Sequence, residues 1–143
     1  SAGVGVHYQK FNRSPRVDKI DLIDCRPNAL ILGYSVISAK LHKNLPALLG
    51  PSPSPKLINK MCLETQVNST TPPAFIWHTA DDPVVPVINS LNFAASLQKF
   101  KIPFELHIFP HGVHGLALAP GDPHIAQWLN LCAEWLIQAG WLK

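Results

Sequence analysis

The sequence predicts an α/β protein with a mostly parallel sheet. Three observations carry this prediction. Apolar runs of strand length alternate with segments whose apolar residues recur at helical spacing. Strands that are separated by helices form right-handed βαβ units, and such units build parallel sheets. Fourteen prolines in 143 residues favour loops and strand-to-helix turns over a helical bundle.

The first part of the chain contains one predicted strand. Ala2–Phe11 predicts a short helix after a tight turn, with glycines that lower its helix propensity. The polar stretch Asn12–Pro27 predicts a loop, with a turn of helix near Asp18–Ile23. Asn28–Ile37 is a nearly continuous apolar run, which is typical of a strand buried on both faces of a parallel sheet.

The segment from Ser38 to Pro73 is interpreted as an excursion from the sheet. It carries prolines at positions 46, 51, 53, 55, 72 and 73, with short amphipathic pieces such as Lys56–Cys62 between them. Its placement after the first strand suggests a lid-like role over the rim of a site. We expect one domain over residues 1–143, with this excursion at about 38–73.

Two further strands follow. Ala74–Thr79 is an apolar run introduced by a Pro-Pro pair, and it predicts a second buried strand. Phe104–Phe109 alternates apolar and polar residues, and this pattern predicts a third strand nearer the sheet edge. Three strands make a small sheet with an exposed edge, so we expect this chain to be part of a larger domain.

Two helices accompany these strands. The first begins at Pro86 and runs to about Phe100, with an apolar face made of Ile88, Leu91, Ala95, Phe93, Leu97 and Phe100. The second covers Pro123–Ala139, is capped by Asp122-Pro123 and stops at Gly140. Its stripe at helical spacing places Ile125, Trp128, Leu129, Cys132, Trp135 and Leu136 in the core.

Composition excludes several classes of protein. The chain is 47% hydrophobic and 15% charged, which excludes intrinsic disorder as its main state. It contains no apolar run of the roughly 18–20 residues that cross a bilayer, and its net charge of +3 is too weak for a nucleic-acid-binding surface. The odd cysteine count (Cys25, Cys62 and Cys132) favours thiols in a reducing compartment, so we expect a cytoplasmic protein.

Polar, ionisable loops follow the second and third predicted strands. The first reads HTADDPVVP from His78 to Pro86, and the second reads PHGVHG from Pro110 to Gly115. Active residues in open α/β sheets gather where strands end, so a carboxylate and an imidazole are expected to meet at one rim. Ser1, in the sequence Ser-Ala-Gly, supplies a candidate nucleophile, and the order Ser, Asp, His is that of a nucleophile-elbow hydrolase.

Two longer segments carry a family resemblance. PPAFIWHTADDPVVPVINSL and FELHIFPHGVHGLALA, together with ALILGYSVIS and the SAG start, resemble the C-terminal half of the α/β-hydrolase superfamily. Within it they are similar to lipase/esterase-like proteins related to acetylxylan esterases and dienelactone hydrolases. The resemblance implies an incomplete three-layer α/β/α hydrolase fold. It departs from the family at S-A-G-V-G, at Tyr34-Ser35, and in lacking the N-terminal half with its Gly-rich oxyanion loop.

The resemblance also implies a site. It assigns the acid to Asp82, the catalytic histidine to His114 and the nucleophile to Ser1, with the Ala2 N–H as an oxyanion donor. These residues predict a serine hydrolase that cleaves carboxylic esters, short acyl or acetylated sugar esters, through an acyl-enzyme. We expect a small-molecule ester substrate, no cofactor, no nucleic-acid partner and no membrane span, and the association of copies stays open.

Alternatives remain for the function and for the neighbouring residues. A metal-dependent hydrolase would use His78, Asp82, His111 and His114 as ligands, and a non-catalytic fragment would serve as an interaction module. We expect Asp81 to be a turn or capping residue. His78 is expected to be a hydrogen-bonded core histidine, and His111 to be exposed and incidental.

Overall fold

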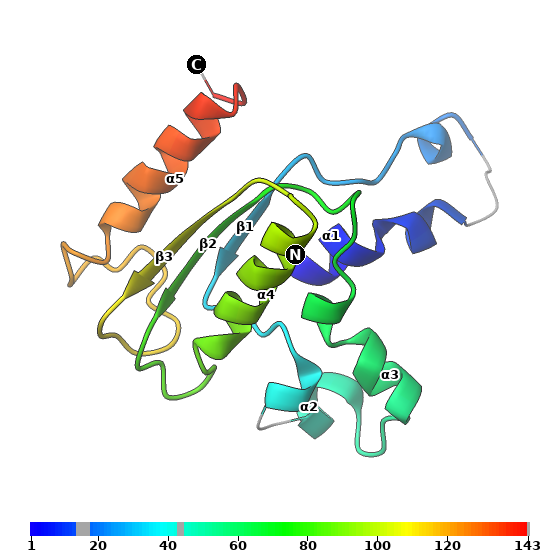
Figure 1. Cartoon of the computed structure of the whole chain (residues 1–143), viewed down its shortest axis with the longest axis horizontal. Helices are drawn as coiled ribbons and strands as arrows, with labels where there is room; N and C mark the ends of the chain where they lie inside the picture. Colours follow the sequence, from blue (N-terminus) through cyan, green and yellow to red (C-terminus); the bar gives the residue numbers. More distant parts are fainter. Residues whose placement is uncertain (14–17, 43–44, 143) are drawn as a thin grey trace.

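The computed structural model describes residues 1–13, 18–42 and 45–142. It contains a three-stranded parallel sheet in the order β1-β2-β3, formed by β1 (Leu30–Gly33), β2 (Ala74–Thr79) and β3 (Phe104–Phe109). Figure 1 shows this sheet between helices that lie on its two faces. The predicted bounds of β2 and β3 are confirmed.

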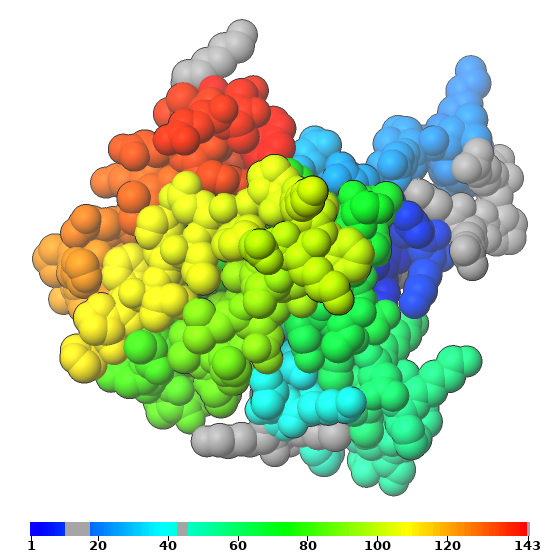
Figure 2. Space-filling model, in the orientation of Figure 1, coloured from blue at the N-terminus to red at the C-terminus, as the bar shows by residue number. Residues whose placement is uncertain are grey.

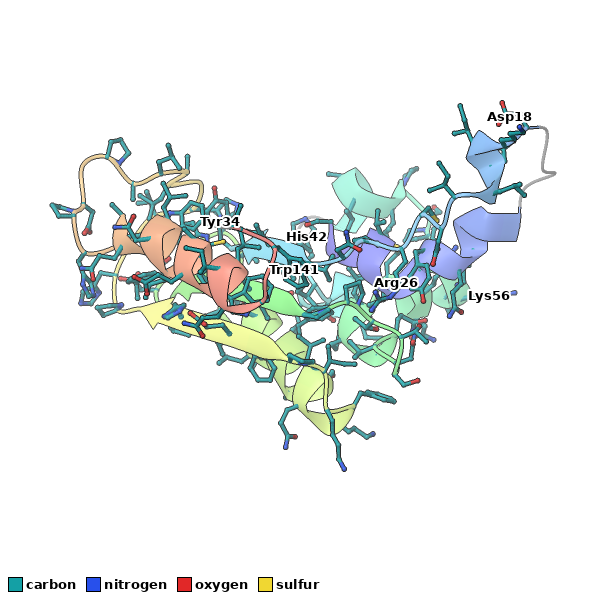
Figure 3. The ribbon with its side chains drawn as sticks, turned by 90° about the horizontal axis from the view of Figure 1, so that it is seen from above. Asp18, Arg26, Tyr34, His42, Lys56 and Trp141 are labelled. Carbon is teal, nitrogen blue, oxygen red and sulfur yellow. The ribbon has the colours of Figure 1, made fainter. Side chains whose placement is uncertain are left out.

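The two faces of the sheet bury separate cores, because side chains alternate along each strand. One core joins Leu30, Leu32, Ala74 and Ile76 to α1 (Ala2–His7) and α4 (Ile88–Lys99). The other joins Phe75, Trp77 and Phe109 to α5 (Gln127–Gln138). Seen from above, α5 and α4 lie on opposite sides of the strands (Figure 3). The predicted α/β/α layering is therefore confirmed.

The central strand β2 is buried along all six residues. Ala74 pairs with Leu30 on one side and with Phe104 on the other, and the register continues to Thr79 opposite Phe109. A strand with a neighbour on each edge and helices on both faces has no route to solvent. Its end therefore delivers the following loop, residues 80–86, to a well-defined position.

The prediction of a strand over Asn28–Ile37 that is buried on both faces is wrong. β1 covers only Leu30–Gly33, and Ile31 is 45% exposed. Among the described residues, β1 pairs only with β2, and α5 packs over β2 and β3 and leaves Ile31 uncovered. Tyr34, at φ +38°, turns the chain out of the strand.

The N-terminal segment folds as two short helices rather than one. α1 is followed by the 3-10 helix η1 (Tyr8–Arg13), and a second 3-10 turn, η2 (Ile20–Leu22), lies where a turn of helix was expected. Part of the predicted loop, residues 14–17, lies outside the described residues. α1 packs tightly on β1 at Gly5, where a Cβ would lie only 2.5 Å from Leu30 Cδ1.

The helix predicted from Pro86 begins two residues later, and its apolar face is narrower than expected. Phe93 and Leu97 are fully buried. Ile88 and Leu91 are each 41% exposed, and Ala95 is also exposed. The apolar residues therefore extend round the helix beyond the stripe that the sheet covers.

The last helix is also shorter than predicted. Asp122 Oδ1 accepts hydrogen bonds from the backbone N–H groups of His124 and Ile125, so the chain turns before α5 begins. Trp135 is buried and Trp128 is half-buried, but Leu129 is 47% exposed, contrary to the prediction. Gly140, at φ +76°, ends the helix as expected.

The described part of the segment from Ser38 to Pro73 contains four short helices. They are η3 (Ala39–Leu41), α2 (Leu45–Leu49), α3 (Pro55–Lys60) and η4 (Leu63–Thr65). Ser54 caps α3 by accepting a hydrogen bond from the Leu57 N–H. Leu63 and Val67 are buried in the core beneath α1 and α4, whereas α3 buries no residue. Figure 2 shows residues 46–60, cyan to blue-green, at the lower right, away from α5 in orange to red.

Among the described helices, none is both long enough and apolar enough to cross a membrane.

Candidate active site

The candidate site lies where β2 and β3 end and their two loops meet. Thr79, the last residue of β2, donates a hydrogen bond from Oγ1 to the Gly112 carbonyl at 2.8 Å. A Cβ at position 112 would lie 2.8 Å from Thr79 Cγ2, so only glycine allows this close approach. The parallel register therefore brings residues more than thirty positions apart into one place.

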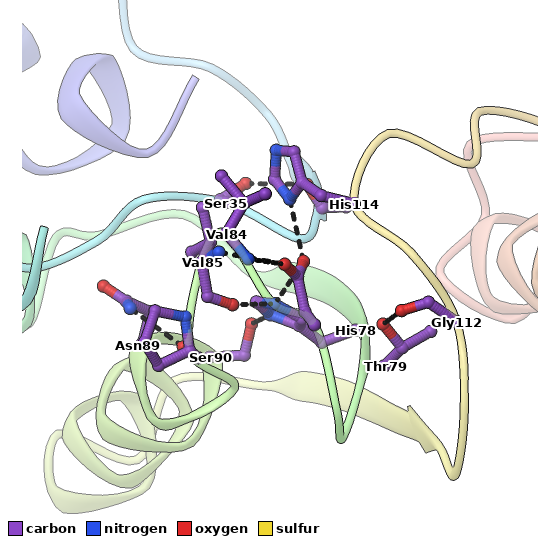
Figure 4. A network of polar contacts seen from close by, with 12 residues as sticks. Ser35, His78, Thr79, Val84, Val85, Asn89, Ser90, Gly112 and His114 are labelled. Carbon is purple, nitrogen blue, oxygen red and sulfur yellow. Dashed lines mark hydrogen bonds and ion pairs between the residues drawn. The ribbon is translucent and has the colours of Figure 1, made fainter. Parts of the chain in front are cut away.

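The side chain of Asp82 is held in the first loop by hydrogen bonds from the backbone of residues that follow it. Its Oδ1 accepts hydrogen bonds from the N–H groups of Val84 at 2.8 Å and Val85 at 2.9 Å, an Asx-type turn. The side chain is fully buried. The other oxygen, Oδ2, lies 2.7 Å from His114 Nδ1 (Figure 4). The expected meeting of a carboxylate and an imidazole at this rim is thus observed.

The environment of Asp82 favours the ionised carboxylate. Burial acts to raise its pKa, as it does for any carboxyl group removed from water. The hydrogen bond with His114 and those from the Val85 and Val84 N–H groups outweigh burial and lower the pKa of Asp82 below its ordinary value. An ionised Asp82 is therefore available to accept a hydrogen bond from an imidazole N–H.

His114 stands between this carboxylate and solvent. Its side chain is 30% exposed, and the Tyr34 ring packs edge-on against it at a centroid distance of 5.0 Å. Gly115 follows at φ +84°, a conformation that favours glycine. With Nδ1 donating to Asp82, His114 Nε2 carries the lone pair and makes no hydrogen bond within the described residues. This is the arrangement of a general base.

His78 is the core histidine that the sequence predicts. Its side chain is fully buried, and its nitrogens lie 2.8 Å from Ser90 Oγ and 2.9 Å from the Val85 carbonyl oxygen. Burial lowers its pKa below the ordinary value of 6.5, although the Val85 carbonyl and Asp82 act to raise it. His78 is therefore neutral at neutral pH.

Asp81 joins the two loops at the surface. Its Oδ2 lies 2.9 Å from His111 Nδ1, and its Oδ1 accepts a hydrogen bond from the Gly112 N–H at 2.8 Å. These bonds lower the pKa of Asp81, the one with His111 most strongly. The His111 side chain is 85% exposed, as expected. It is not incidental, however, because it is part of this link.

Ser1 and Ala2 lie at the start of α1. Ser1 is exposed, and its carbonyl oxygen accepts the first helical hydrogen bond, from the Gly5 N–H at 3.1 Å. Ala2 is buried against β1, and as one of the first residues of the helix its N–H has no intrahelical acceptor. No hydrogen bond joins Ser1 to His114 within the described part of the chain. The structure thus brings Asp82 and His114 together, and the nucleophilic role of Ser1 stays a prediction.

The four residues considered as metal ligands do not surround a common point. His111 is bonded to Asp81, and His78 is bonded to Ser90 and Val85. Over the residues that the structure describes, no group of three or more His, Cys, Asp or Glu side chains is placed to hold a metal ion. The metal-dependent alternative therefore has no ligand set here.

Two neighbours of the site were not found by sequence reasoning. Ser90 contacts His78 from α4, twelve residues along the chain, and no motif connects the two. Tyr34 contacts His114 across eighty positions. In the sequence it lies inside the predicted strand Asn28–Ile37 and at a departure from the family pattern, and neither feature indicates this contact.

Tyr34, which contacts His114, also lines an apolar pocket of about 300 Å³. Trp77 and Trp128 stack in its wall at a centroid distance of 5.0 Å, and Trp128 Nε1 donates to the Ala117 carbonyl. The remaining lining residues are Ile31, Gly33, Tyr34 and Leu118. The pocket therefore shares one aromatic wall with the candidate site.

Comparison with solved structures finds the same fold in a hydrolase. The chain superposes on an acetyl ester-xyloside bifunctional hydrolase from Caldicellulosiruptor lactoaceticus with a TM-score of 0.92 and 42% identity. The match covers 99% of this chain and 53% of that one. The chain thus spans about half the length of this solved relative.

Sequence comparison gives the family. The chain is 42% identical over 109 residues to an endo-1,4-beta-xylanase B of Butyrivibrio fibrisolvens, covering 74% of this chain and 17% of the relative. It is 33% identical over 121 residues to an acetylxylan esterase of Xylanibacter ruminicola, covering 79% and 25%. The model of the prolyl oligopeptidase family matches residues 52–140. The chain therefore belongs to the prolyl oligopeptidase family and has the α/β-hydrolase fold.

Proposed function

We propose that this chain is the C-terminal part of one α/β-hydrolase domain that cleaves carboxylic esters with a Ser1–His114–Asp82 triad. The observation that carries the proposal is the 2.7 Å contact between His114 Nδ1 and the buried carboxylate of Asp82. A buried, ionised carboxylate fixes the imidazole tautomer and stabilises the imidazolium that forms during acyl transfer. The share of the solved relative that the chain covers supports its assignment as one part of a domain.

The proposed reaction is acyl transfer in two steps. Ser1 Oγ attacks the ester carbonyl carbon, and its proton passes to His114 Nε2. The Ala2 N–H donates a hydrogen bond to the resulting oxyanion. The tetrahedral intermediate then breaks the bond to the alcohol, which takes the proton from His114 and leaves. Water, deprotonated by the same imidazole, releases the acid from the acyl-enzyme.

Short acyl and acetylated sugar esters are the proposed substrates. The acetyl ester-xyloside hydrolase and the acetylxylan esterase, named for acetyl ester substrates, both match most of this chain. The partner of the chain is then a small-molecule ester, and the chemistry needs no cofactor beyond the three side chains.

A fluorophosphonate probe tests the proposal, because it reacts with activated serine hydroxyls. We expect the chain to be labelled at Ser1 by peptide mapping, and expect His114→Ala or Ser1→Ala to abolish the label. Ser35→Ala is the control that keeps it. Because the lack of one oxyanion donor lowers turnover by about 10²–10³, labelling of the serine is a more sensitive readout than the rate of ester hydrolysis. No label would favour the non-catalytic alternative, and a label on Ser35 would remove Ser1 from the proposed triad.

The lid-like role of residues 38–73 remains part of the proposal. Its support is the contrast between α3, which buries no residue, and Leu63, which anchors the return of the segment in the core. In α2, Leu48 is 42% exposed. We expect Leu48→Ser to change the acyl-chain preference of the active enzyme, and an unchanged preference would count against a lid.

The cellular setting is also proposed. The buried thiols of Cys62 and Cys132 and the odd cysteine count support a cytoplasmic location. The exposed edge strand β1 supports association of copies, which sedimentation velocity would detect as a concentration-dependent species.

A further inference from the structure

One oxygen of the Asp82 carboxylate contacts two imidazoles. His114 Nδ1 lies 2.7 Å from Oδ2, and His78 Nε2 lies 3.3 Å from the same atom. His114 comes from the loop after β3, whereas His78 is in β2 itself. Dashed lines in Figure 4 mark the contacts that the labelled rings of His114 and His78 make. The proposed function uses only the first of these contacts.

The second imidazole is fixed in place by its other partners. A carbonyl oxygen can only accept, so the 2.9 Å contact with the Val85 carbonyl requires a proton on His78 Nε2. Nδ1 then accepts from the Ser90 hydroxyl at 2.8 Å. The side chains of His78 and Ser90 are both buried, and that of His78 is completely inaccessible to solvent. The Nε2–H therefore donates to the Val85 carbonyl, and Asp82 Oδ2 lies 3.3 Å from the same nitrogen.

We propose that His78 is a positioning residue, whose Nε2–H restrains Asp82 Oδ2 in the orientation that accepts the hydrogen bond from His114 Nδ1–H. Its significance for catalysis rests on the proposed function, but the restraint itself is a property of the folded chain. The titratable groups that face His78 are Asp82 and His114, and α4 contributes the hydroxyl of Ser90. The lowered pKa of His78 agrees with a neutral ring that donates rather than competes for the carboxylate's charge.

The restraint follows from the donors around the carboxylate. Two backbone N–H groups hold Oδ1, and without His78 the contact with His114 would be the one left at Oδ2 among the contacts of the described residues. A rotated Asp82 aligns less well with His114 Nδ1, and hydrogen bonds weaken steeply with misalignment. If His78 acted only electronically, its removal would strengthen the hydrogen bond between His114 Nδ1–H and Asp82 Oδ2, because an oxygen that loses one donor binds the remaining donor more strongly.

The experiment measures the His114 Nδ1–H directly, by proton NMR of the ¹⁵N-histidine-labelled 143-residue chain. We expect His78→Phe, which retains a ring but no donor, to speed exchange of this proton with water about tenfold. His78→Gln retains an N–H donor and should restore slow exchange. Ser90→Ala, which frees the ring without removing it, should give an intermediate rate. His107→Gln alters a histidine of β3 that bonds to Glu105, and is the control without effect.

The outcomes separate this inference from the proposed function. An Nδ1–H that exchanges at the wild-type rate or more slowly in both His78→Phe and Ser90→Ala would overturn the positioning role, even if Ser1 is labelled by the fluorophosphonate. If His78→Phe does not fold, as judged by its backbone amide spectrum, Ser90→Ala decides alone. Faster exchange in a chain that is not labelled would retain the positioning role and remove the esterase.

Discussion

Asp81 and His111 form a second carboxylate–imidazole pair, 2.9 Å from Oδ2 to Nδ1, directly beside the pair formed by Asp82 and His114. Consecutive residues of one loop thus contact two histidines of the other. The outer pair is exposed, and the inner carboxylate is buried. The same chemical contact therefore has different consequences at the two positions.

We expect Asp81→Ala to slow labelling of Ser1 by less than about fivefold. The pair is exposed to solvent, where water screens ion pairs and they contribute little. The Thr79–Gly112 hydrogen bond still joins the loops in this variant. The measurement is the pseudo-first-order rate of fluorophosphonate labelling, and a loss as large as that of an Asp82 variant would contradict this interpretation.

Asp82→Asn should slow the same reaction by about 10³–10⁴. The amide retains an oxygen for the Val84 and Val85 N–H groups, so we expect the loop to keep its turn. Its NH₂ group then faces His114 Nδ1 as a donor and favours the wrong imidazole tautomer. A labelling rate within tenfold of the wild type would remove Asp82 from the triad.

Stability should fall as the pH is lowered below 6.5. Burial lowers the pKa of His78 and of His7 in the folded chain, so between the folded and ordinary values the unfolded chain binds more protons. The stability associated with these neutral rings is complete above 6.5 and is lost as the pH falls through the folded pKa. The lowered pKa of Asp82 acts only below 3.8.

Urea unfolding followed by tryptophan fluorescence measures this effect at about pH 7.5 and about pH 5.5. His78→Gln has no titrating ring, so the difference in the free energy of unfolding between the two pH values should shrink. Equal pH dependence in wild type and His78→Gln would contradict the assignment.

Gly5→Ala should be less stable than Gly3→Ala. Both substitutions raise helix propensity by about 1 kcal/mol. A Cβ at Gly5 would lie 2.5 and 2.9 Å from the two methyl carbons of buried Leu30, and such overpacking costs about 1–3 kcal/mol. A Cβ at Gly3 would meet only Leu63 Cδ1, at 4.0 Å. The check is the denaturation midpoint of each variant, and a more stable Gly5→Ala would show that Leu30 moves freely.

Local pattern was sufficient to place two of the strands and the end of the last helix. β2 and β3 lie where apolar runs and alternation predict them, and α5 ends at the predicted glycine. The same pattern was wrong for β1, and it overestimated the buried face of α4. Periodicity reports which residues favour burial, but exposure depends on which neighbours are present to cover them.

For the candidate site, the order of residue types along the chain was enough to single out Asp82 and His114, because parallel strands deliver their following loops to one edge. The chain alone gave no reason to connect His78 with Ser90, or Asp81 with His111. Those contacts depend on side-chain directions at the ends of elements that pack only after folding. The residue types of the site and the order of the strands could thus be predicted from the sequence. The sharing of one buried carboxylate by two imidazoles was decided by three-dimensional packing, since hydrogen bonding requires an alignment that no linear spacing encodes.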